Sequence, residues 1–434
     1  PYIRQEEFSV IKPYLQSHFE TFAGTADLYV YFVERGLQIT KQNGSFIYIL
    51  PNKWMRAGYG NALRQWVQQY TIGFIHDFGD LPVFEEATTY PCLWNIIKQK
   101  PTQNTFISSN IQTLDFTDRL ESYIETIAFK VNSEMLSDAG WTLVDDSKQK
   151  LLEKIKSKGI PLGEYVNGKI FRGVLTGLNE AFVIDEETKS RMIAENPSSA
   201  EIIKPFLAGR DIKRYQQPKS DKYLILIPKG FTIKSFLQID SFKANEPPPR
   251  YGNMEYDAAW EWFSKKYPAV ANHLLPFKSK ATVRTDKGDF WWELRACDYY
   301  EEFEKGKIIY PNICKQPEFV YDTSKQYTNQ KCFIIPEADK YLLALLNSRV
   351  TYFLFQNLLP KLRGDFYEPS YLYFKDFPIV ESENRNEFIT IADQIIDAKS
   401  FNAAADTTAL ESEIDRLVYE LYGLSEEEIK MVEL

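Results

Sequence analysis

The stretch FKSKATVRTDKGDFWWELR, residues 277–295, interleaves five basic side chains with two tryptophans. Cations neutralise DNA phosphates and planar side chains pack on sugars or bases, so this composition is typical of a nucleic-acid-binding face. The predicted contacts are Lys278, Lys280, Arg284, Lys287 and Arg295. Acidic residues within the stretch dilute its charge. The alternative is therefore an exposed loop in which Trp291 and Trp292 anchor a core.

Two further basic clusters also have a structural and a functional interpretation. FLAGRDIKRY contains Arg210, Lys213 and Arg214, and PKLRGDFY contains Lys361 and Arg363. The ordinary interpretation of such clusters is a solvated charged turn. The functional interpretation is contact with phosphate, which orients a protein on a duplex without reading its sequence.

Composition excludes several classes of function. A net charge of -9 over 434 residues argues against indiscriminate coating of nucleic acid, although a local basic groove can lie on an acidic body. The four cysteines, Cys92, Cys297, Cys314 and Cys332, form no CxxC pair, and there are only three histidines, so no metal site is predicted. No apolar run is long enough to span a bilayer. The sequence also lacks the Gly-x-Ser-x-Gly turn of α/β hydrolases, which argues against that class. We expect a cytoplasmic protein without a membrane partner.

Residues 1–117 alternate between helical and strand-like patterns. A helix is predicted within GTADLYVYFVERGLQIT, with Leu28, Tyr31, Phe32 and Leu37 inward and Glu34 and Arg35 outward. A second helix lies in GNALRQWVQQY, with Leu63, Trp66 and Val67 inward. Apolar runs at 46–50, in TIGFIHDFG and in TTYPCLWNIIKQK predict buried strands. This order indicates an α/β domain with a mostly parallel sheet covered on both faces.

A cofactor-binding half is not visible in this domain. The chain has no glycine-rich turn from a strand into a helix and no acidic residue placed to hold a ribose. We therefore interpret residues 1–117 as the second half of a Rossmann-like domain, and we expect the first half upstream of Pro1.

Residues 98–110 are polar and loop-like and close the first domain. The residues after 117 are predicted to form three segments, of which 118–165 is a helical connector around LLEKIKSKG. Residues 166–380 form a mixed α+β domain, in which Leu342, Leu343, Leu345 and Leu346 pack a helix that ends near Asn347. Residues 381–434 are helical: Leu410, Ile414, Leu417 and Leu421 share one face, and YGLS ends that helix. Packing onto the preceding domain is expected, and a coiled coil is the weaker alternative because the repeat is short.

Four motifs in this order carry a resemblance to a known family: PYIRQEE, GTADLYVYF, NKWMRAGYG and DFGDLPVF. They resemble the later motifs of adenine-N6 DNA methyltransferases, in particular the type IIG restriction–modification proteins. Further along, TGLNEAF and IIKPFLAGRDIKRY resemble the opening of that family's DNA-specificity domain, and the likeness continues to the C-terminus. In the family a strand ends in Asn-Pro-Pro-Tyr, so Pro1 and Tyr2 would be the last two residues of that motif, preceded by Asn-Pro.

The resemblance implies a chemistry for these residues. Adenine N6 is a weak nucleophile buried in the duplex, so the base must be flipped into a pocket where a polar clamp and aromatic faces hold it. Tyr2 and Phe84 would be the two stacking faces, and Asp27, Asn52 and Lys53 would line or support the pocket. The alternatives are a frayed terminal residue for Tyr2 and a core aromatic for Phe84.

The resemblance also implies partners and limits. S-adenosylmethionine would donate the methyl group, and double-stranded DNA would be bound by a monomer, with phosphate contacts at Arg210, Lys213 and Arg214. Mg²⁺ would be needed only if a nuclease is fused upstream, and no such module is visible. We expect the 434-residue chain alone neither to bind S-adenosylmethionine tightly nor to methylate DNA. The alternative function is a specificity module that binds DNA without chemistry.

Overall fold

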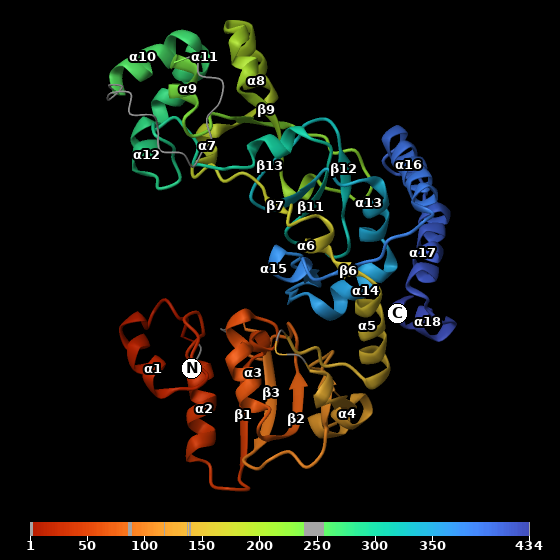
Figure 1. Cartoon of the computed structure of the whole chain (residues 1–434). Coiled ribbons are helices and arrows are strands. Elements are labelled where there is room, and N and C mark those ends of the chain that lie inside the picture. The colour runs from red at the N-terminus through yellow and green to blue at the C-terminus, as the bar shows by residue number, and fades with distance from the viewer. Residues whose placement is uncertain are drawn as a thin grey trace. The chain divides into compact units, whose positions relative to one another are not determined.

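The protein forms two compact units. The computed structural model describes residues 3–85, 89–116, 118–136, 138, 140–237 and 256–433. The first unit comprises Pro1–Ser157 and a later segment, Gln356–Glu368. The second comprises Lys158–Phe355 and Pro369–Glu433. Figure 1 shows the elements of both units along the chain.

The first unit is built on a five-stranded sheet. Its strands are β1 (Ser45–Pro51), β2 (Thr71–Asp77), β3 (Pro91–Ile97), β4 (Thr105–Asn110) and β5 (Phe129–Asn132), in the order β1-β3-β2-β4-β5. Only the β2–β4 pairing is parallel, so the predicted mostly parallel sheet is wrong. The cause is β3, which follows the loop after β2 and runs reversed between β1 and β2. An apolar run predicts a buried strand but carries no information on its direction.

Residues 98–110 are also more regular than predicted. Thr105–Asn110 forms β4, and its two serines are fully buried. The hydroxyl of Ser108 donates to the carbonyl of Ile75 at 2.7 Å, and Ser109 lies 2.8 Å from Nδ1 of His76. These partners in β2 let polar side chains occupy a strand interior. Within the predicted helical connector, β5 adds a strand between α4 (Leu120–Ile127) and α5 (Asp146–Lys158).

Two predicted helices of the first unit are present beside the sheet (Figure 1). In α3 (Asn61–Val67), Leu63, Trp66 and Val67 are buried, as predicted. In α2 (Tyr29–Ile39) the predicted faces are partly wrong, because Phe32 is 47% exposed and Glu34 is fully buried. The Glu34 carboxylate accepts hydrogen bonds from the backbone N–H and hydroxyl of Thr21 at 2.9 and 2.8 Å. A buried acid is therefore used to fasten the loop that precedes the helix.

A tryptophan cluster and a buried arginine fix the turn that follows β1. The ring of Trp54, in the 3-10 helix η2 (Asn52–Met55), lies 4.8 Å from that of Trp94 and 5.2 Å from that of Trp141. Arg64 is fully buried and donates to the carbonyls of Trp54 and Ala57. These contacts hold η2 rigidly at the end of β1.

The second unit contains two four-stranded sheets. One has the order β13 (Tyr327–Thr328), β9 (Ile203–Leu207), β10 (Lys222–Ile225), β8 (Val183–Asp185). The other has the order β12 (Val320–Asp322), β11 (Lys307–Pro311), β14 (Cys332–Pro336), β7 (Phe171–Arg172). Helices α8 (Glu186–Glu195), α10 (Tyr256–Lys266), α11 (Pro268–Leu274) and α12 (Lys278–Val283) lie near the first of these sheets (Figure 1).

The C-terminal part of the second unit is helical, as predicted. In helix α13 (Lys340–Leu346) the residues Tyr341–Leu346 are all buried, and Asn347 caps its C-terminal end. It packs on α16 (Arg385–Phe401), which is followed by α17 (Thr408–Tyr422) and α18 (Glu426–Glu433). Gly423 has a φ of 65° and ends α17, because glycine adopts this left-handed conformation without strain. Within the described ranges, no helix has the length and apolarity to cross a membrane.

Candidate functional site

Two polar side chains meet at one edge of the first unit's sheet. Both β1 and β2 run antiparallel to β3, so their carboxyl ends lie at the same edge. Asn52 follows β1 and donates from Nδ2 to Oδ1 of Asp77, the last residue of β2, at 2.8 Å. The Gly79 N–H donates to the same oxygen at 2.9 Å. Burial raises the pKa of Asp77, whereas the hydrogen bond from Asn52 lowers it.

Asp77 was not among the predicted site residues, although the sequence contained a signal for it. It stands directly after the apolar run of β2 in FIHDFGD. An acidic residue at the carboxyl end of a buried strand is well placed to line a site at a sheet edge.

Asp27 supports the start of the chain. Its Oδ1 accepts a hydrogen bond from the backbone N–H of Gln5 at 3.2 Å, and the N–H of Leu28 donates to the carbonyl of Ile3 at 3.2 Å. Pro1 and Tyr2 directly precede this segment and lie outside the described residues. That Tyr2 faces Phe84 therefore stays a prediction. Lys53 is exposed at the surface of η2.

The half-buried Phe84 lies in the loop between β2 and β3, of which the structure describes residues 78–85, 89 and 90. A hairpin from much later in the chain, β15 (Lys361–Leu362) and β16 (Phe366–Tyr367), contacts this loop. The N–H of Gly364 donates to Oδ2 of Asp80 at 3.1 Å, and the N–H of Arg363 donates to the hydroxyl of Tyr90 at 2.9 Å. These two contacts fix the loop on both sides of Phe84. Gly364 has a φ of 82°, which only glycine adopts readily at the hairpin tip.

The base of the hairpin is also attached to the first unit. The guanidinium of Arg56 donates to the carbonyl of Leu359, and the hydroxyl of Thr142 donates to the carbonyl of Asn357 at 3.2 Å. Two of the predicted DNA contacts, Lys361 and Arg363, are thus exposed beside the Phe84 loop. The Lys361 ammonium pairs with Asp365 at 2.8 Å.

The basic stretch 277–295 has a largely structural role. Arg284 is 9% exposed, and its guanidinium donates to the carbonyls of Thr176, Trp291 and Glu293. It also lies over the ring of Phe182, and burial lowers its pKa to about 10. Arg284 is therefore a structural residue rather than a DNA contact.

The aromatic residues of the same stretch belong to the core. Trp291 is 2% exposed and Trp292 is fully buried. The indole N–H of Trp292 donates to the Thr232 hydroxyl at 3.0 Å. These rings cannot pack on DNA, so the tryptophan-anchored core is the correct interpretation of Trp291 and Trp292, whereas Lys278–Val283 forms helix α12 rather than a loop.

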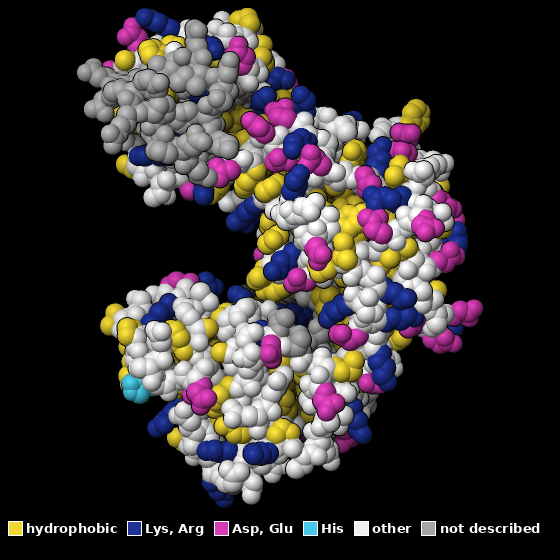
Figure 2. Space-filling model, viewed as in Figure 1, with side chains coloured by type: hydrophobic (Ala, Val, Ile, Leu, Met, Phe, Trp, Pro, Cys, Tyr) yellow, Lys and Arg dark blue, Asp and Glu magenta, His cyan; other side chains and the backbone are white. Residues whose placement is uncertain are grey.

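The other basic side chains are exposed or half-buried, and several of them are paired. Arg214 pairs with Glu411 at 2.6 Å, Lys280 with Glu180 at 2.7 Å and Arg295 with Asp286 at 3.3 Å. Lys287 donates to the carbonyl of Thr282. Lys213 and Lys278 are exposed and have no carboxylate within ion-pair distance in the described chain, and Arg210 is 78% exposed with Asp211 at 3.6 Å. Figure 2 shows Lys and Arg side chains interspersed with Asp and Glu over the drawn face.

The described residues supply neither a metal cluster nor a recognisable site for a nucleotide-type cofactor. No group of three His, Cys, Asp or Glu side chains among them could hold a metal ion. Strand β1 runs into η2 through Pro51 and Asn52, and β2 runs into Asp77, neither through a glycine-rich turn into a helix. These residues do not fit the phosphate- or ribose-binding turns of such sites, so no part of a methyl-donor site is assigned to them.

Family models match both units of the chain. Residues 1–84 match the Eco57I restriction-modification methylase, and residues 204–379 match the TaqI-like C-terminal specificity domain. The chain thus carries a segment similar to a methylase followed by a segment similar to a specificity domain, and this order resembles that of type II restriction–modification methyltransferases.

Individual relatives agree with this class. The chain is 21% identical to the type II methyltransferase M.BstVI of Geobacillus stearothermophilus, over 100% of this chain and 73% of the relative. It is 27% identical to the restriction enzyme and methyltransferase RM.Eco57I of Escherichia coli, over 43% of this chain and 18% of the relative. Among solved structures, the type IIL restriction-modification enzyme MmeI in complex with DNA has a similar fold, with a TM-score of 0.60 at 13% identity. The match covers 99% of this chain and 55% of MmeI.

Proposed function

We propose that this chain holds the target base and recognises the DNA sequence in an S-adenosylmethionine-dependent adenine-N6 methyltransferase of a restriction–modification system. The observation that carries the proposal is the order of the two family matches, methylase at residues 1–84 and specificity domain at 204–379. The geometry at the sheet edge supports it. Asn52 and Asp77 form a fixed polar pair there, and the loop carrying Phe84 is fastened by a hairpin from the later part of the chain.

Each part has a defined role in the proposed reaction. The donor, when bound, supplies an electrophilic methyl group. The chain's own residues hold the flipped adenine: Phe84 stacks on the ring, and Asp27 positions the N-terminal segment through its hydrogen bond from the Gln5 N–H. Holding the amine in line with the methyl group is an orientation effect, which accounts for much of the rate enhancement in such transfers. The specificity domain selects the site on double-stranded DNA, and we propose that the protein acts as a monomer.

The product identifies the reaction. The complete reading frame that contains this chain is expressed in cells lacking DNA methylation, and the digested DNA is analysed by nucleoside mass spectrometry. N6-methyladenine is the expected product, and it falls about 5- to 150-fold in Phe84→Ala because a stacking contact contributes about 1–3 kcal/mol. The exposed Phe401→Ala on α16 is the matched control and keeps the wild-type level. Methylcytosine, or no methylated base, would overturn the assignment.

DNA contact by the exposed basic residues is tested through salt dependence. Arg210→Ala and Lys213→Ala should weaken binding on all sequences and lower the slope of log K against log salt by about 0.9 for each lost phosphate contact. Binding is measured by fluorescence anisotropy between 50 and 200 mM salt, about the range over which such contacts change affinity strongly. An unchanged slope would make these residues solvated surface charges.

A further inference from the structure

A recess of about 340 Å³ opens on the second unit, beside the end of β7. Its lining includes Arg172, Gly173, Arg295, Tyr299, Tyr300 and Gln330. None of the predicted DNA contacts except Arg295 lies in it. The recess brings together two arginines, a glutamine and two tyrosines from segments far apart in the chain. Arg and Gln are among the side chains that read base edges in the major groove.

The guanidinium of Arg172 is oriented by its neighbour. Its Nε donates to the carbonyl of Gln330 at 3.0 Å, which leaves the two terminal nitrogens directed elsewhere. Arg172 is exposed and forms no ion pair with a carboxylate of the described chain, whereas Arg295 on the same recess pairs with Asp286. Of the two arginines, Arg172 therefore has its bidentate donor pair available.

Tight backbone packing holds Arg172 in place. A Cβ on Gly173 would lie 1.9 Å from the carbonyl oxygen of Asn329, so glycine alone lets β7 approach this turn so closely. The Gly173 N–H donates to the carbonyl of Cys332 at 2.9 Å. On the other side of Arg172, the ring of Phe171 stacks on that of Tyr299, with centroids 4.6 Å apart and an interplanar angle of 16°.

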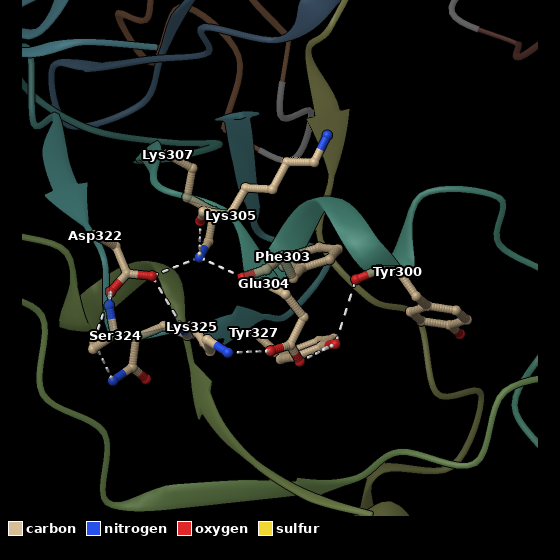
Figure 3. Close-up of polar contacts among 10 residues, drawn as sticks. Tyr300, Phe303, Glu304, Lys305, Lys307, Asp322, Ser324, Lys325 and Tyr327 are labelled. Atoms are coloured by element: carbon tan, nitrogen blue, oxygen red, sulfur yellow. Dashed lines mark hydrogen bonds and ion pairs between the residues drawn. The ribbon is translucent and has the colours of Figure 1, made fainter. Parts of the chain in front are cut away.

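A buried ion pair, drawn in Figure 3, fixes the part of the wall that Tyr300 forms. Lys307 and Asp322 are both fully buried and pair at 2.6 Å, and the Lys307 ammonium also donates to the Phe303 carbonyl at 2.7 Å. Phe303 belongs to the 3-10 helix η8 (Tyr300–Glu304), whose first residue lines the recess. The hydroxyl of Tyr327 donates to Glu304 at 2.9 Å and to the carbonyl of Tyr300 at 3.3 Å. The wall is thus rigid before any ligand arrives, as a selective site requires.

We propose that Arg172 reads one guanine of the target sequence in the major groove, oriented by the carbonyl of Gln330. Guanine presents two acceptors there, O6 and N7, which match the paired terminal nitrogens of an arginine. This inference rests on the proposed function, because it requires that the second unit recognises DNA. It assigns base selectivity to Arg172, whereas the exposed cations elsewhere neutralise phosphate without selectivity.

The test is a selection of duplexes from a randomised library by the 434-residue chain, followed by sequencing of the bound DNA. Wild type should enrich one sequence with an invariant guanine. Arg172→Ala should lose the preference for that guanine by roughly 10- to 100-fold and keep the preference at all other positions. Arg172→Lys should recover part of it, since lysine supplies a donor without the bidentate fork. Arg191→Ala, an exposed arginine on α8, is the matched control and keeps the wild-type sequence.

The outcomes separate this inference from the proposed function. An unchanged consensus in Arg172→Ala, with or without a uniform loss of affinity, overturns the inference and leaves DNA recognition in place. Absence of any enriched sequence with wild type overturns both. Thermal unfolding of each variant, compared with wild type, shows that a changed consensus comes from a folded protein.

Discussion

Removal of the Lys307 ammonium should destabilise the second unit strongly. Lys307 and Asp322 are both fully buried, and the ammonium donates to Asp322 at 2.6 Å and to the Phe303 carbonyl at 2.7 Å. In Lys307→Met the Asp322 carboxylate stays buried without its counter-charge, although backbone N–H groups of Ser324 and Gln326 still donate to it. Breaking a buried pair in this way costs about 3–5 kcal/mol.

The charge itself, rather than the packing of the lysine stem, is responsible for this cost. The double variant Lys307→Met/Asp322→Asn removes both charges, so it should be more stable than the sum of the two single variants predicts. The expected coupling lies at about 1–3 kcal/mol, since the groups are in direct contact. Lys325→Met is the matched control in the same network: Lys325 is 64% exposed and lies 3.6 Å from Glu304. An exposed pair of this kind contributes only about 0–1 kcal/mol.

Urea unfolding followed by tryptophan fluorescence measures these differences, because Trp291 and Trp292 are buried in the second unit. Two results would refute the reasoning. One is a loss below about 1 kcal/mol in Lys307→Met, the range of an exposed pair. The other is additivity of the two single substitutions, which would mean that the buried charges do not compensate each other.

Three further predictions concern other parts of the structure. Burial raises the pKa of Asp415 to about 6, so the stability that its protonated form contributes is complete below the unfolded pKa near 4 and is lost as the pH rises through about 6. In Asp415→Asn the free energy of unfolding should therefore change less over this pH range, by about 1–3 kcal/mol in chemical unfolding, and a profile identical to wild type would contradict the burial effect. Arg284→Met should lower the free energy of unfolding by at least about 2 kcal/mol, because it leaves buried carbonyls without donors. The slope of DNA affinity against salt should stay at the wild-type value, and a lower slope would show that Arg284 contacts phosphate after all. Tyr90→Phe removes the hydroxyl that accepts the Arg363 N–H, so backbone amide hydrogen exchange in Lys361–Phe366 should become faster, by up to about tenfold for a hydrogen bond of 0.5–1.5 kcal/mol. Unchanged exchange rates would show that the hairpin does not depend on this hydrogen bond.

Local pattern predicted the elements of the first unit well and their arrangement poorly. The apolar runs of β1, β2 and β3 were found from sequence because burial selects apolar side chains, but strand direction depends on connections that the runs do not encode. Strand β4 was missed because Ser108 and Ser109 find partners in β2, which no local pattern reveals. Glu34 was placed outside for the same reason: its partner Thr21 lies 13 residues away.

The candidate sites show the same limit. Asn52 and Asp27 were expected near the base pocket, and each makes a hydrogen bond that organises the sheet edge or the N-terminal segment. The attachment of the hairpin to the Phe84 loop joins Gly364 to Asp80 across 284 positions and has no sequence signal. Arg172 stood outside every basic cluster. Its significance comes from the single carbonyl that orients it.

The most direct test of the central claim is a map of methylated adenines along DNA from cells that express the complete reading frame. We expect N6-methyladenine at one recurring sequence with wild type, a level reduced about fivefold or more with Phe84→Ala, and a sequence degenerate at a single guanine with Arg172→Ala. Methylation confined to cytosine, or adenine methylation that Phe84→Ala leaves at the wild-type level, would contradict a base pocket built around the Phe84 loop.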